Sequence, residues 1–342
     1  MERLNKILTT AFYKDASDIH FTAGVPPVFR INGKLTMEKS EKLMPDDTEE
    51  MARSILSDQV WEKFQKEREV DLSYGISGLS RFRVNIYYQR GAVAMAFRVI
   101  ARDIPTIDQL KIPQKLKELV GKPYGLLLVT GPTGSGKSTS LASMINYMNM
   151  EMNRHIITLE DPIEYLHSHN KSVIDQREIG FDTRSFKDGL RASLRQDPDV
   201  ILVGELRDMD TIQTAITAAE TGHLVMGTLH TQDTTGTIDR IIDVFPAEQK
   251  DQIRTILASV LIGVMSQRLF PTLDQQGRVA ATELLVNNSA IKNLIRSEKM
   301  HQIPNVLQTA KDQGMHTMEM SMKRLIQEGK ISQLEMKAYF DK

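Results

Sequence analysis

Residues 125–139 read GLLLVTGPTGSGKST, and this stretch decides the fold of the larger part of the chain. Residues 126–129 form a short apolar run that predicts a buried strand, and apolar residues return at helical spacing from Leu141 onward. Between these two patterns, residues 131–138 fit the sequence G-x-x-x-x-G-K-[ST] of a phosphate-binding loop. Strand, loop and helix follow one another in the order that such a loop requires, so a chance glycine-rich turn is the weaker interpretation.

The residue types in this loop indicate how it would bind a nucleotide. Glycines let backbone N–H groups turn toward one point, and the following helix offers the positive end of its dipole to phosphate. Lys137 would neutralise the β- and γ-phosphates, and the Ser138 hydroxyl would ligate Mg²⁺, so ATP and Mg²⁺ are the expected ligands. The expected nucleotide-binding residues are Gly131, Pro132, Thr133, Gly134, Ser135, Gly136, Lys137, Ser138 and Thr139.

Composition excludes several other classes of protein. The chain has 342 residues, enough for about two domains, and its 43 basic and 44 acidic residues argue against a general nucleic-acid-binding surface. The absence of cysteine excludes disulfides and thiolate zinc sites and is compatible with a reducing cytoplasm. We expect no signal peptide, and the apolar stretch 256–265 is too short to span a bilayer, so any membrane link would come through a partner.

The first hundred residues combine short strands with helices. Residues 1–14 place apolar side chains on one helical face, and Asn32-Gly33 separates two short runs that predict a hairpin. A helix is expected over 46–66 and strands over 71–100. These patterns predict an antiparallel α+β domain.

The pattern changes after a proline-punctuated segment. Apolar runs near residues 126, 156, 200 and 224 alternate with helical patterns, which predicts a mostly parallel sheet and the α/β fold class. We predict an N-terminal domain over 1–102, a linker over 103–113, and a second domain over 114–342 that includes a helical region from about 287.

Two later strands end in carboxylates. The apolar run Val200–Val203 is followed by Glu205, which is placed to hold Mg²⁺ through water beside a phosphate loop. The run that starts near 156 ends in Glu160 and Asp161, with Glu164 three residues later, and such acids suit water activation. Each pattern alone is also typical of a solvated turn, but their positions after the phosphate loop favour function.

Histidine and arginine residues supply further candidates. In the segment 221–231, His223 precedes an apolar strand and His230 follows it, so either could contact a γ-phosphate, although a single histidine is more often structural. Arg81 and Arg83 share the polar face of a predicted strand, which is either a solvated face or a functional one. The spacing of Arg184, Arg191 and Arg195 predicts one helical face, either solvated or part of a subunit interface.

These motifs, in this order, resemble those of the secretion-ATPase superfamily of type II secretion and type IV pilus motors. Residues 160–164 resemble its Asp box, and residues 221–231 resemble its His box. Residues 290–299 resemble the signature of the pilus retraction branch, the PilT family, with departures at Lys292 and Ser297. Further segments that resemble this branch are 18–20, 24–27, 81–85, 195–200 and 219–223.

The resemblance implies a PAS-like N-terminal domain, a RecA-like P-loop ATPase core and a homohexameric ring. It implies that Glu164 is the catalytic carboxylate and that Arg81 and Arg83 act in trans on a neighbour's nucleotide. With Glu205 and His230, the expected catalytic residues are therefore Glu164, Glu205 and His230. The implied partners are an inner-membrane pilus platform protein and a paralogous retraction ATPase, without nucleic acid or direct membrane insertion. The implied location is cytoplasmic, at the inner face of the cytoplasmic membrane beneath the pilus.

The expected function is therefore an ATPase motor that powers pilus retraction or disassembly, and with it twitching motility. An accessory retraction ATPase of the PilU type, or another type II secretion or pilus assembly ATPase, is the nearest alternative. A nucleotide-dependent DNA-binding protein on a RecA-like core and a non-hydrolysing regulator of another motor are alternatives from different classes. Balanced charge argues against the first of these, and the full set of chemical residues argues against the second.

Overall fold

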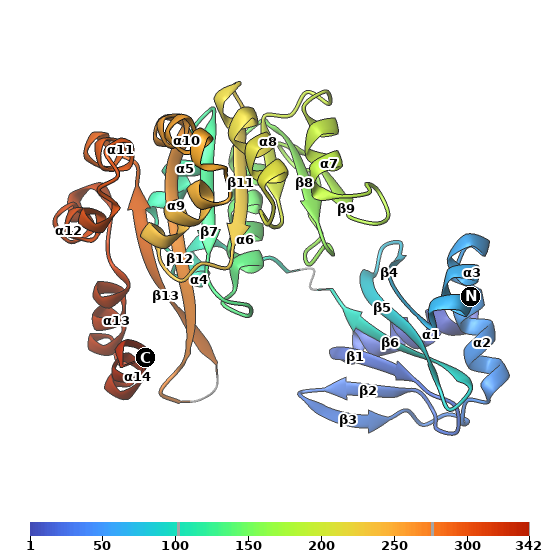
Figure 1. Ribbon diagram of the computed structural model, residues 1–342. Helices are drawn as coiled ribbons and strands as arrows, with labels where there is room; N and C mark the ends of the chain where they lie inside the picture. The colour runs from blue at the N-terminus through green and yellow to red at the C-terminus, as the bar shows by residue number, and fades with distance from the viewer. Residues whose placement is uncertain (101–102, 275–276, 342) are drawn as a thin grey trace. The chain divides into compact units, whose positions relative to one another are not determined.

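The computed structural model describes residues 1–100, 103–274 and 277–341, and the chain folds into two units (Figure 1). Unit 1 comprises Met1–Asp103 and Glu164–Leu166, and unit 2 comprises Ile104–Ile163 and His167–Lys342. The expected domain limit at residue 102 and the chain end at 342 lie outside the described residues. Ile107 and Ile112, from the expected linker, are buried in the core of unit 2. The predicted bounds of the two domains and of the linker stay a prediction.

Within its described residues, unit 1 contains a six-stranded antiparallel sheet in the order β3-β2-β1-β6-β5-β4. Its elements are α1 (Glu2–Tyr13), β1 (Ala16–Phe21), β2 (Val28–Ile31), β3 (Lys34–Met37), α2 (Pro45–Arg53), α3 (Asp58–Glu67), β4 (Glu69–Ile76), β5 (Ser80–Gln89) and β6 (Ala92–Val99).

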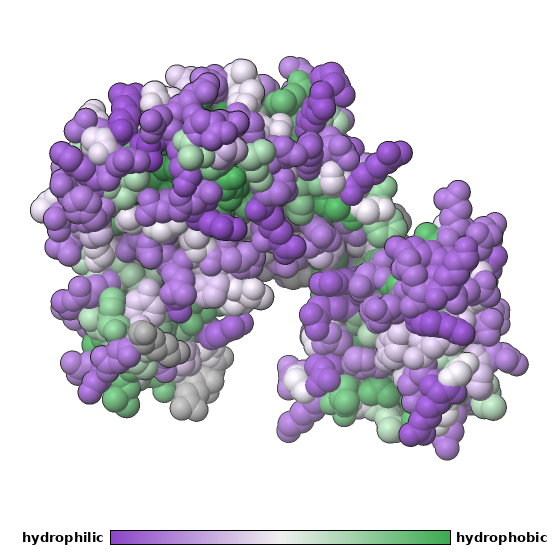
Figure 2. Space-filling model, viewed as in Figure 1, coloured by the Kyte–Doolittle hydropathy of each residue, from purple (hydrophilic) through white to green (hydrophobic). Residues whose placement is uncertain are grey.

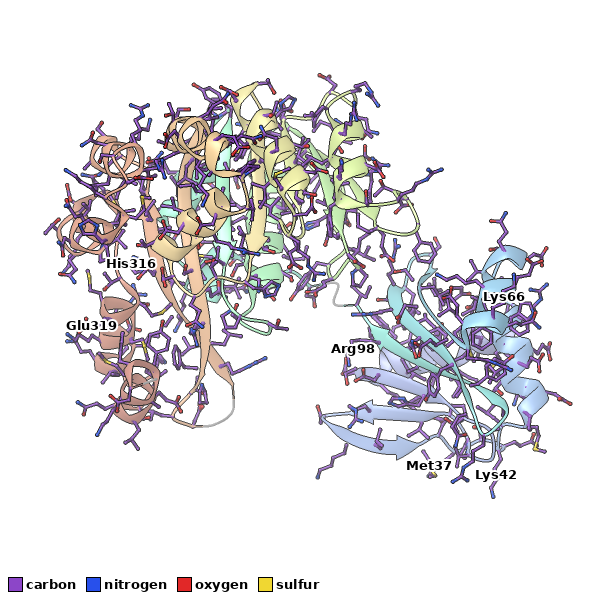
Figure 3. All side chains as sticks on the ribbon, viewed as in Figure 1. Met37, Lys42, Lys66, Arg98, His316 and Glu319 are labelled. Carbon is purple, nitrogen blue, oxygen red and sulfur yellow. The ribbon has the colours of Figure 1, made fainter. Side chains whose placement is uncertain are left out.

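Alternation decides which face of this sheet is buried. On β5, Phe82 and Val84 are fully buried while Arg83 between them is exposed, as the sequence predicts. The opposite face is polar: Nε of Arg98, labelled in Figure 3, donates to Oδ1 of Asp18 on the neighbouring strand at 2.9 Å. The antiparallel α+β prediction for this part of the chain is therefore confirmed.

The prediction of one helix over 46–66 is wrong, because the structure has two helices there. α2 ends at Arg53, and α3 begins at Asp58. Ser57 is the N-cap of α3, and its Oγ accepts a hydrogen bond from the backbone N–H of Val60 at 3.4 Å. Serine satisfies the free N–H groups of a new helix start better than it continues an existing helix, which explains the break.

Unit 2 is built on a seven-stranded sheet, as far as its residues are described, in the order β13-β12-β7-β11-β10-β8-β9. Its first elements are α4 (Ile107–Leu110), α5 (Lys115–Val120), β7 (Gly125–Thr130), α6 (Lys137–Glu151), β8 (His155–Glu160), β9 (Val173–Glu178), α7 (Phe186–Ser193), β10 (Val200–Val203), α8 (Met209–Glu220) and β11 (Leu224–Leu229). They are followed by α9 (Thr234–Asp243), α10 (Ala247–Val260), β12 (Leu261–Pro271), β13 (Arg278–Val286), α11 (Ser289–Arg296), η1 (Met300–Gln302), α12 (Ile303–Thr309), η2 (Lys311–Gln313), α13 (Met318–Gln327) and α14 (Gln333–Phe340).

The central strands of unit 2 run parallel, with β7, β11 and β10 side by side and every residue of each buried. β12 adds a parallel strand beside β7, and β13 pairs antiparallel with β12. This is the mixed α/β architecture predicted from the buried apolar runs and their helical spacers. Parallel strands bring their carboxyl ends to one edge, so the loops after β7, β8, β10 and β11 gather there.

The structure of unit 2 adds two strands that the sequence patterns missed and corrects the expectation on the spaced arginines. The sequence patterns missed β9, whose residues are largely polar, and β12, whose apolar run continues directly from α10. Only Arg191 of the three spaced arginines lies in α7, because Ser185 caps that helix after Arg184 and the helix ends before Arg195. On α11 the buried stripe consists of Ile291, Leu294 and Ile295, and Ala290 before it is exposed.

The visible surface of the protein is mostly hydrophilic (Figure 2). In the view of Figure 2, hydrophilic residues cover most of the visible surface, and hydrophobic ones are scattered among them. Among the described residues, the structure contains no helix with the length and apolar character needed to cross a membrane.

Candidate functional site

The predicted phosphate loop joins β7 to α6 at the carboxyl edge of the sheet (Figure 1). Gly131 has a φ of 141°, and a Cβ at this residue would lie 2.3 Å from the backbone oxygen of Gln267. Glycine alone tolerates both that conformation and that close approach. Nζ of Lys137 donates hydrogen bonds to the carbonyl oxygens of Gly131 (2.8 Å) and Pro132 (3.1 Å). The ammonium therefore lies across the loop.

Gln267, on β12, fastens the loop from the neighbouring strand. Its Nε2 donates to the carbonyl oxygen of Ser135 at 2.7 Å, and its Oε1 accepts from Oγ of Ser140 at 2.7 Å. Gln267 is 3% exposed, so both bonds are shielded from water. Sequence patterns missed this residue, because its partners lie more than a hundred positions away.

The loop carries an observation that fits an anionic ligand. Oγ of Ser135 is buried and makes no hydrogen bond within the described residues. A buried hydroxyl without a partner costs free energy, so such an atom fits a loop that completes its hydrogen bonding when an oxyanion binds. Together with the glycine backbone and Lys137, this donor set suits phosphate.

A chain of hydroxyl groups lies beneath the loop. Oγ1 of Thr130, at the end of β7, is 2.7 Å from Oγ of Ser266 and accepts from Oγ1 of Thr237 at 3.4 Å. Oγ1 of Thr237 is in turn 2.7 Å from Oγ1 of Thr231, the residue after His230. The end of β7 is thus linked to the segment that follows β11.

Glu205 lies two residues beyond β10, at the same carboxyl edge of the sheet as the phosphate loop. Its Oε1 accepts from Nε of Arg207 at 2.7 Å and lies 3.2 Å from Nε2 of His230. Partial burial acts to raise the pKa of Glu205, but the hydrogen bond and charge of Arg207, with His230, outweigh it and hold that pKa below its ordinary value. Glu205 is therefore a carboxylate at neutral pH, as a metal-binding role requires.

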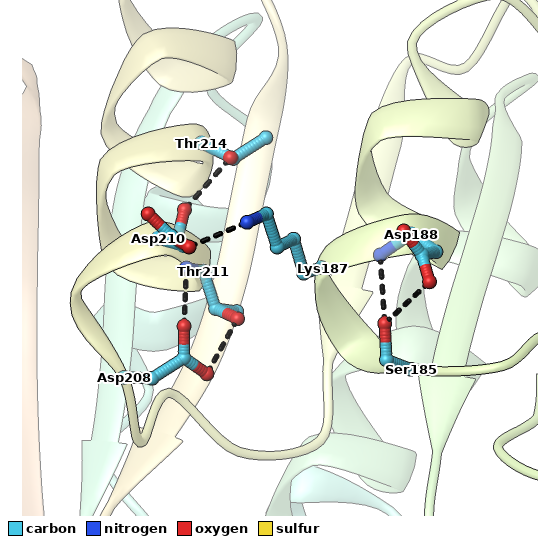
Figure 4. A network of polar contacts seen from close by, with 7 residues as sticks. All are labelled: Ser185, Lys187, Asp188, Asp208, Asp210, Thr211 and Thr214. Atoms are coloured by element: carbon cyan, nitrogen blue, oxygen red, sulfur yellow. Dashed lines mark hydrogen bonds and ion pairs between the residues drawn. The ribbon is translucent and has the colours of Figure 1, made fainter.

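Helix caps fix the backbone directly after Arg207. Asp208 accepts hydrogen bonds from the backbone N–H (2.9 Å) and Oγ1 (2.8 Å) of Thr211 and so caps α8 (Figure 4). Lys187 of α7 pairs with Asp210 of α8 at 2.5 Å. The Asp208 cap thus fixes where α8 begins, and the Lys187–Asp210 pair links α8 to α7.

The acidic residues at the end of β8 and directly after it occupy different environments. Oε1 of Glu160 accepts from Oγ1 of Thr158 (2.6 Å) and Nε2 of Gln176 (3.2 Å). Asp161 is exposed, and after the larger effect of Glu205, its charge also raises the pKa of Arg207. Glu164 is exposed and belongs to unit 1 by its contacts. Glu160 and Asp161 thus lie at the carboxyl end of β8, beside the strand β10 that leads to Glu205, while the approach of Glu164 to them stays a prediction.

The two histidines lie at opposite ends of β11. His230 follows the strand and lies beside Glu205, whereas His223 precedes it, with Nδ1 3.1 Å from the carbonyl oxygen of Ala218. A strand of this length spans roughly 20 Å, so His223 does not lie at the phosphate loop of its own chain. Its contact fits the structural alternative, and a functional role for it stays a prediction.

Arg81 and Arg83 lie on β5 of unit 1. Arg83 is exposed and Arg81 is half-buried. The Arg83 side chain is therefore accessible to a neighbouring subunit. The action of both arginines on a neighbour's nucleotide stays a prediction.

A cavity of about 500 Å³ adjoins the phosphate loop at Gly136 and Thr139. Apolar side chains of Leu110, Ile112 and Leu269 line it. Polar and charged side chains, among them Gln109 and Arg278, complete its walls, which come from the segment before β7, from α6, β12 and β13, and from Lys330. A cavity of mixed polarity next to a phosphate loop suits a nucleotide's base, which has both apolar faces and hydrogen-bonding edges.

Oxygen ligands for a divalent cation are present at this edge. Ser138 lies in the first turn of α6, and Glu205 lies beyond β10. Hydroxyl and carboxylate oxygens are the donors that Mg²⁺ prefers. Over the described part of the chain, no three histidine, cysteine, aspartate or glutamate side chains come together as a ready metal site.

Comparisons with known proteins agree with this geometry. Residues 1–278 match the family described as type II/IV secretion system protein. The type IV pilus retraction ATPase PilT of Pseudomonas aeruginosa is 43% identical over 96% of this chain and 95% of its own length, and the type IV pilus ATPase PilU of the same organism is 39% identical over 98% and 88%. A crystal structure of the pilus retraction motor PilT with bound ADP superposes with a TM-score of 0.88, at 49% identity over 96% of this chain and 94% of that one. The chain therefore belongs to the type II/IV secretion system protein family, the family of secretion and pilus ATPases.

Proposed function

We propose that this protein hydrolyses ATP to power the retraction of type IV pili. The observation that carries the proposal is the carboxyl edge of the unit 2 sheet, which holds a complete phosphate loop, the paired Glu205 and His230, and Glu160 at the end of β8. The similarity to PilT over nearly the whole chain supplies the biological process.

The reaction is ATP + H₂O → ADP + phosphate, and the chain's own residues position and polarise the reactants. Backbone N–H groups of residues 131–136 and the ammonium of Lys137 hold the phosphates, and the cavity beside Gly136 takes the base. Ser138 and Glu205, the latter through water, would hold Mg²⁺, which would neutralise charge on the phosphate oxygens. Glu164 polarises the attacking water, and His230 orients Glu205.

The working assembly in this proposal is a homohexamer in which Arg81 and Arg83 of one subunit reach the nucleotide of the next. Charge that develops on the γ-phosphoryl oxygens needs a cation, and an arginine supplied in trans is worth ~10³–10⁵ in rate. The alternation on β5 supports this role, because it presents both guanidinium groups on one polar face. The remaining partners are an inner-membrane pilus platform protein and a paralogous retraction ATPase, met at the cytoplasmic face of the membrane.

Mixed rings test the trans arrangement. Arg83→Ala and Lys137→Ala subunits should each be inactive alone, but a ring of both contains interfaces in which an intact loop meets an intact arginine. Such rings should release a single-turnover burst of phosphate. No burst from verified mixed hexamers would contradict the trans role and return both arginines to a solvated sheet face.

An accessory retraction motor is the second candidate, favoured by the 39% identity to PilU. Deleting the gene separates these roles from pilus assembly. A primary retraction motor predicts more surface pili and no twitching, restored by the wild-type gene and not by Lys137→Ala. An accessory motor predicts retraction that is weakened but present, and a loss of pili would contradict both retraction roles.

A further inference from the structure

Both ends of the short connection that carries Glu164 are fastened to one strand, β9. The backbone N–H of Ile163 donates to Oε2 of Glu178 at 3.2 Å, and the backbone N–H of His167 donates to Oε1 of Gln176 at 2.9 Å. Gln176 and Glu178 are two positions apart, so their side chains leave the same face of β9. One bond precedes Glu164 by one residue, and the other follows it by three.

Glu178 is an unusual residue to find at such a place, because it is only 3% exposed. Burying a carboxylate is costly unless hydrogen bonds compensate it. Its own backbone is held in a tight turn: its N–H donates to Oδ2 of Asp182 at 2.8 Å, and its carbonyl oxygen accepts from the N–H of Asp182 at 2.9 Å. Asp182 therefore holds the backbone of Glu178, while the carboxylate of Glu178 accepts the hydrogen bond from Ile163.

Gln176 extends the same fastening to the end of β8. Its Nε2 donates to Oε1 of Glu160 at 3.2 Å, and the backbone oxygen of Glu160 accepts from the N–H of Ile179 at 2.9 Å. The strand β9 thus holds the connection at residues 160, 163 and 167. Glu164 lies between the last two points, with a buried Ile163 directly before it.

We infer that Glu178 and Gln176 are positioning residues for hydrolysis, which set the backbone from which Glu164 projects. The inference rests on the proposed catalytic role of Glu164. A carboxylate that polarises water must be held in a narrow range of positions, and a displacement near 1 Å can cost about 10²-fold in rate. Neither residue needs to touch the nucleotide, so nucleotide binding should not depend on them.

The test compares Glu178→Ala with the conservative Glu178→Gln, which keeps an acceptor for Ile163. We expect Glu178→Ala to lower the single-turnover hydrolysis rate about 10- to 100-fold, with an unchanged Kd for a non-hydrolysable ATP analogue. Glu178→Gln should stay within about threefold of the wild-type rate, since the hydrogen bond is retained. Gln176→Ala should lower the rate in the same direction and serves as the second variant if Glu178→Ala does not fold.

Asn149→Ala provides a matched control on the same connection. Asn149 is buried, accepts from the backbone N–H of Asn170 at 3.0 Å and donates to the carbonyl oxygen of Ser168 at 2.7 Å. Like Gln176 and Glu178, Asn149 holds the backbone of the connection through side-chain hydrogen bonds, but at residues 168 and 170, away from Glu164. Its loss should lower the thermal unfolding temperature and leave the hydrolysis rate within about threefold.

A double-mutant cycle separates positioning from general destabilisation. If Glu178 acts through Glu164, then Glu178→Ala adds no further loss to the residual rate of Glu164→Gln. Three outcomes would overturn the positioning role and leave the catalytic assignment of Glu164 intact. They are rate losses of Glu178→Ala and Glu164→Gln that add in full, a parallel loss of analogue binding, or a wild-type rate in both Glu178→Ala and Gln176→Ala. A wild-type rate in Glu164→Gln would instead refute that assignment, and the positioning role would fall with it.

Discussion

The phosphate loop and the connection between β8 and β9 are two loops at the same sheet edge, and each is fastened by side chains from another strand. Gln267 on β12 holds the phosphate loop through Ser135, while β9 holds the acidic connection at both sides of Glu164. They differ in what they present: the first offers backbone N–H groups and a lysine, and the second offers carboxylates. Nucleotide binding and hydrolysis should therefore be separable by mutation.

The largest expected effect is on the binding side. Lys137→Ala removes the ammonium that lies across the loop, so the phosphates lose their main protein charge and affinity for ATP should fall by about 10³-fold or more. Isothermal titration calorimetry measures this loss. Lys137→Arg, which keeps the charge with a different shape, is the control. Tight binding by Lys137→Ala would mean that the loop binds phosphate without its lysine.

A smaller loss should follow from loosening the same loop without touching its charge. Gln267→Leu leaves the buried carbonyl oxygen of Ser135 without its donor, a change that costs about 1–3 kcal/mol. Affinity for ATP should weaken by about tenfold, since 1.4 kcal/mol corresponds to a factor of ten, while the single-turnover rate at saturating ATP stays near wild type. A fall in the single-turnover rate at unchanged affinity would contradict the assignment of binding to the phosphate loop and of hydrolysis to the acidic connection.

The smallest expected effect concerns pH. Because the folded-state pKa of Glu205 lies below its unfolded value, the stabilisation from its partners is complete above the unfolded pKa and is lost as the pH falls through the folded pKa. Arg207→Ala removes the main group that lowers the pKa of Glu205, so the acid limb of stability and activity should move to higher pH. The shift should be modest, since the Arg207 side chain is 74% exposed and solvent screens it. An unmoved acid limb, measured by thermal unfolding and ATPase rate between pH 4 and 7, would contradict the pairing.

The two loops also differ in how much of them the sequence could predict. Residues 131–138 form a local motif, and the apolar runs before and after it predicted both the strand and the helix. The fastening residues Gln267, Gln176 and Glu178 carry no such signal, because the strands that hold them were not recognised. The partners of Gln267 are, in addition, more than a hundred positions away in the sequence. β9 is polar and β12 continues an apolar helix, so periodicity alone could not separate them from their surroundings.

The histidines show a second limit. The spacing of His223 and His230 predicts only that they bracket a strand, and a strand separates its ends by its own length. The direction of the parallel sheet decides which end meets the phosphate loop, and it brings His230 to Glu205. Because parallel strands share one carboxyl edge, the sequence could predict that acids after several strands lie at the same edge of the sheet.

The central claim is that Glu164 serves hydrolysis and not binding, and one pair of measurements on Glu164→Gln tests it most directly. The substitution keeps the shape of the side chain and removes the charge that polarises water. The account predicts a wild-type Kd for ATP together with a single-turnover rate lowered by about 10²-fold or more. A near wild-type rate would contradict the account and make Glu160 or Asp161 the candidate carboxylate.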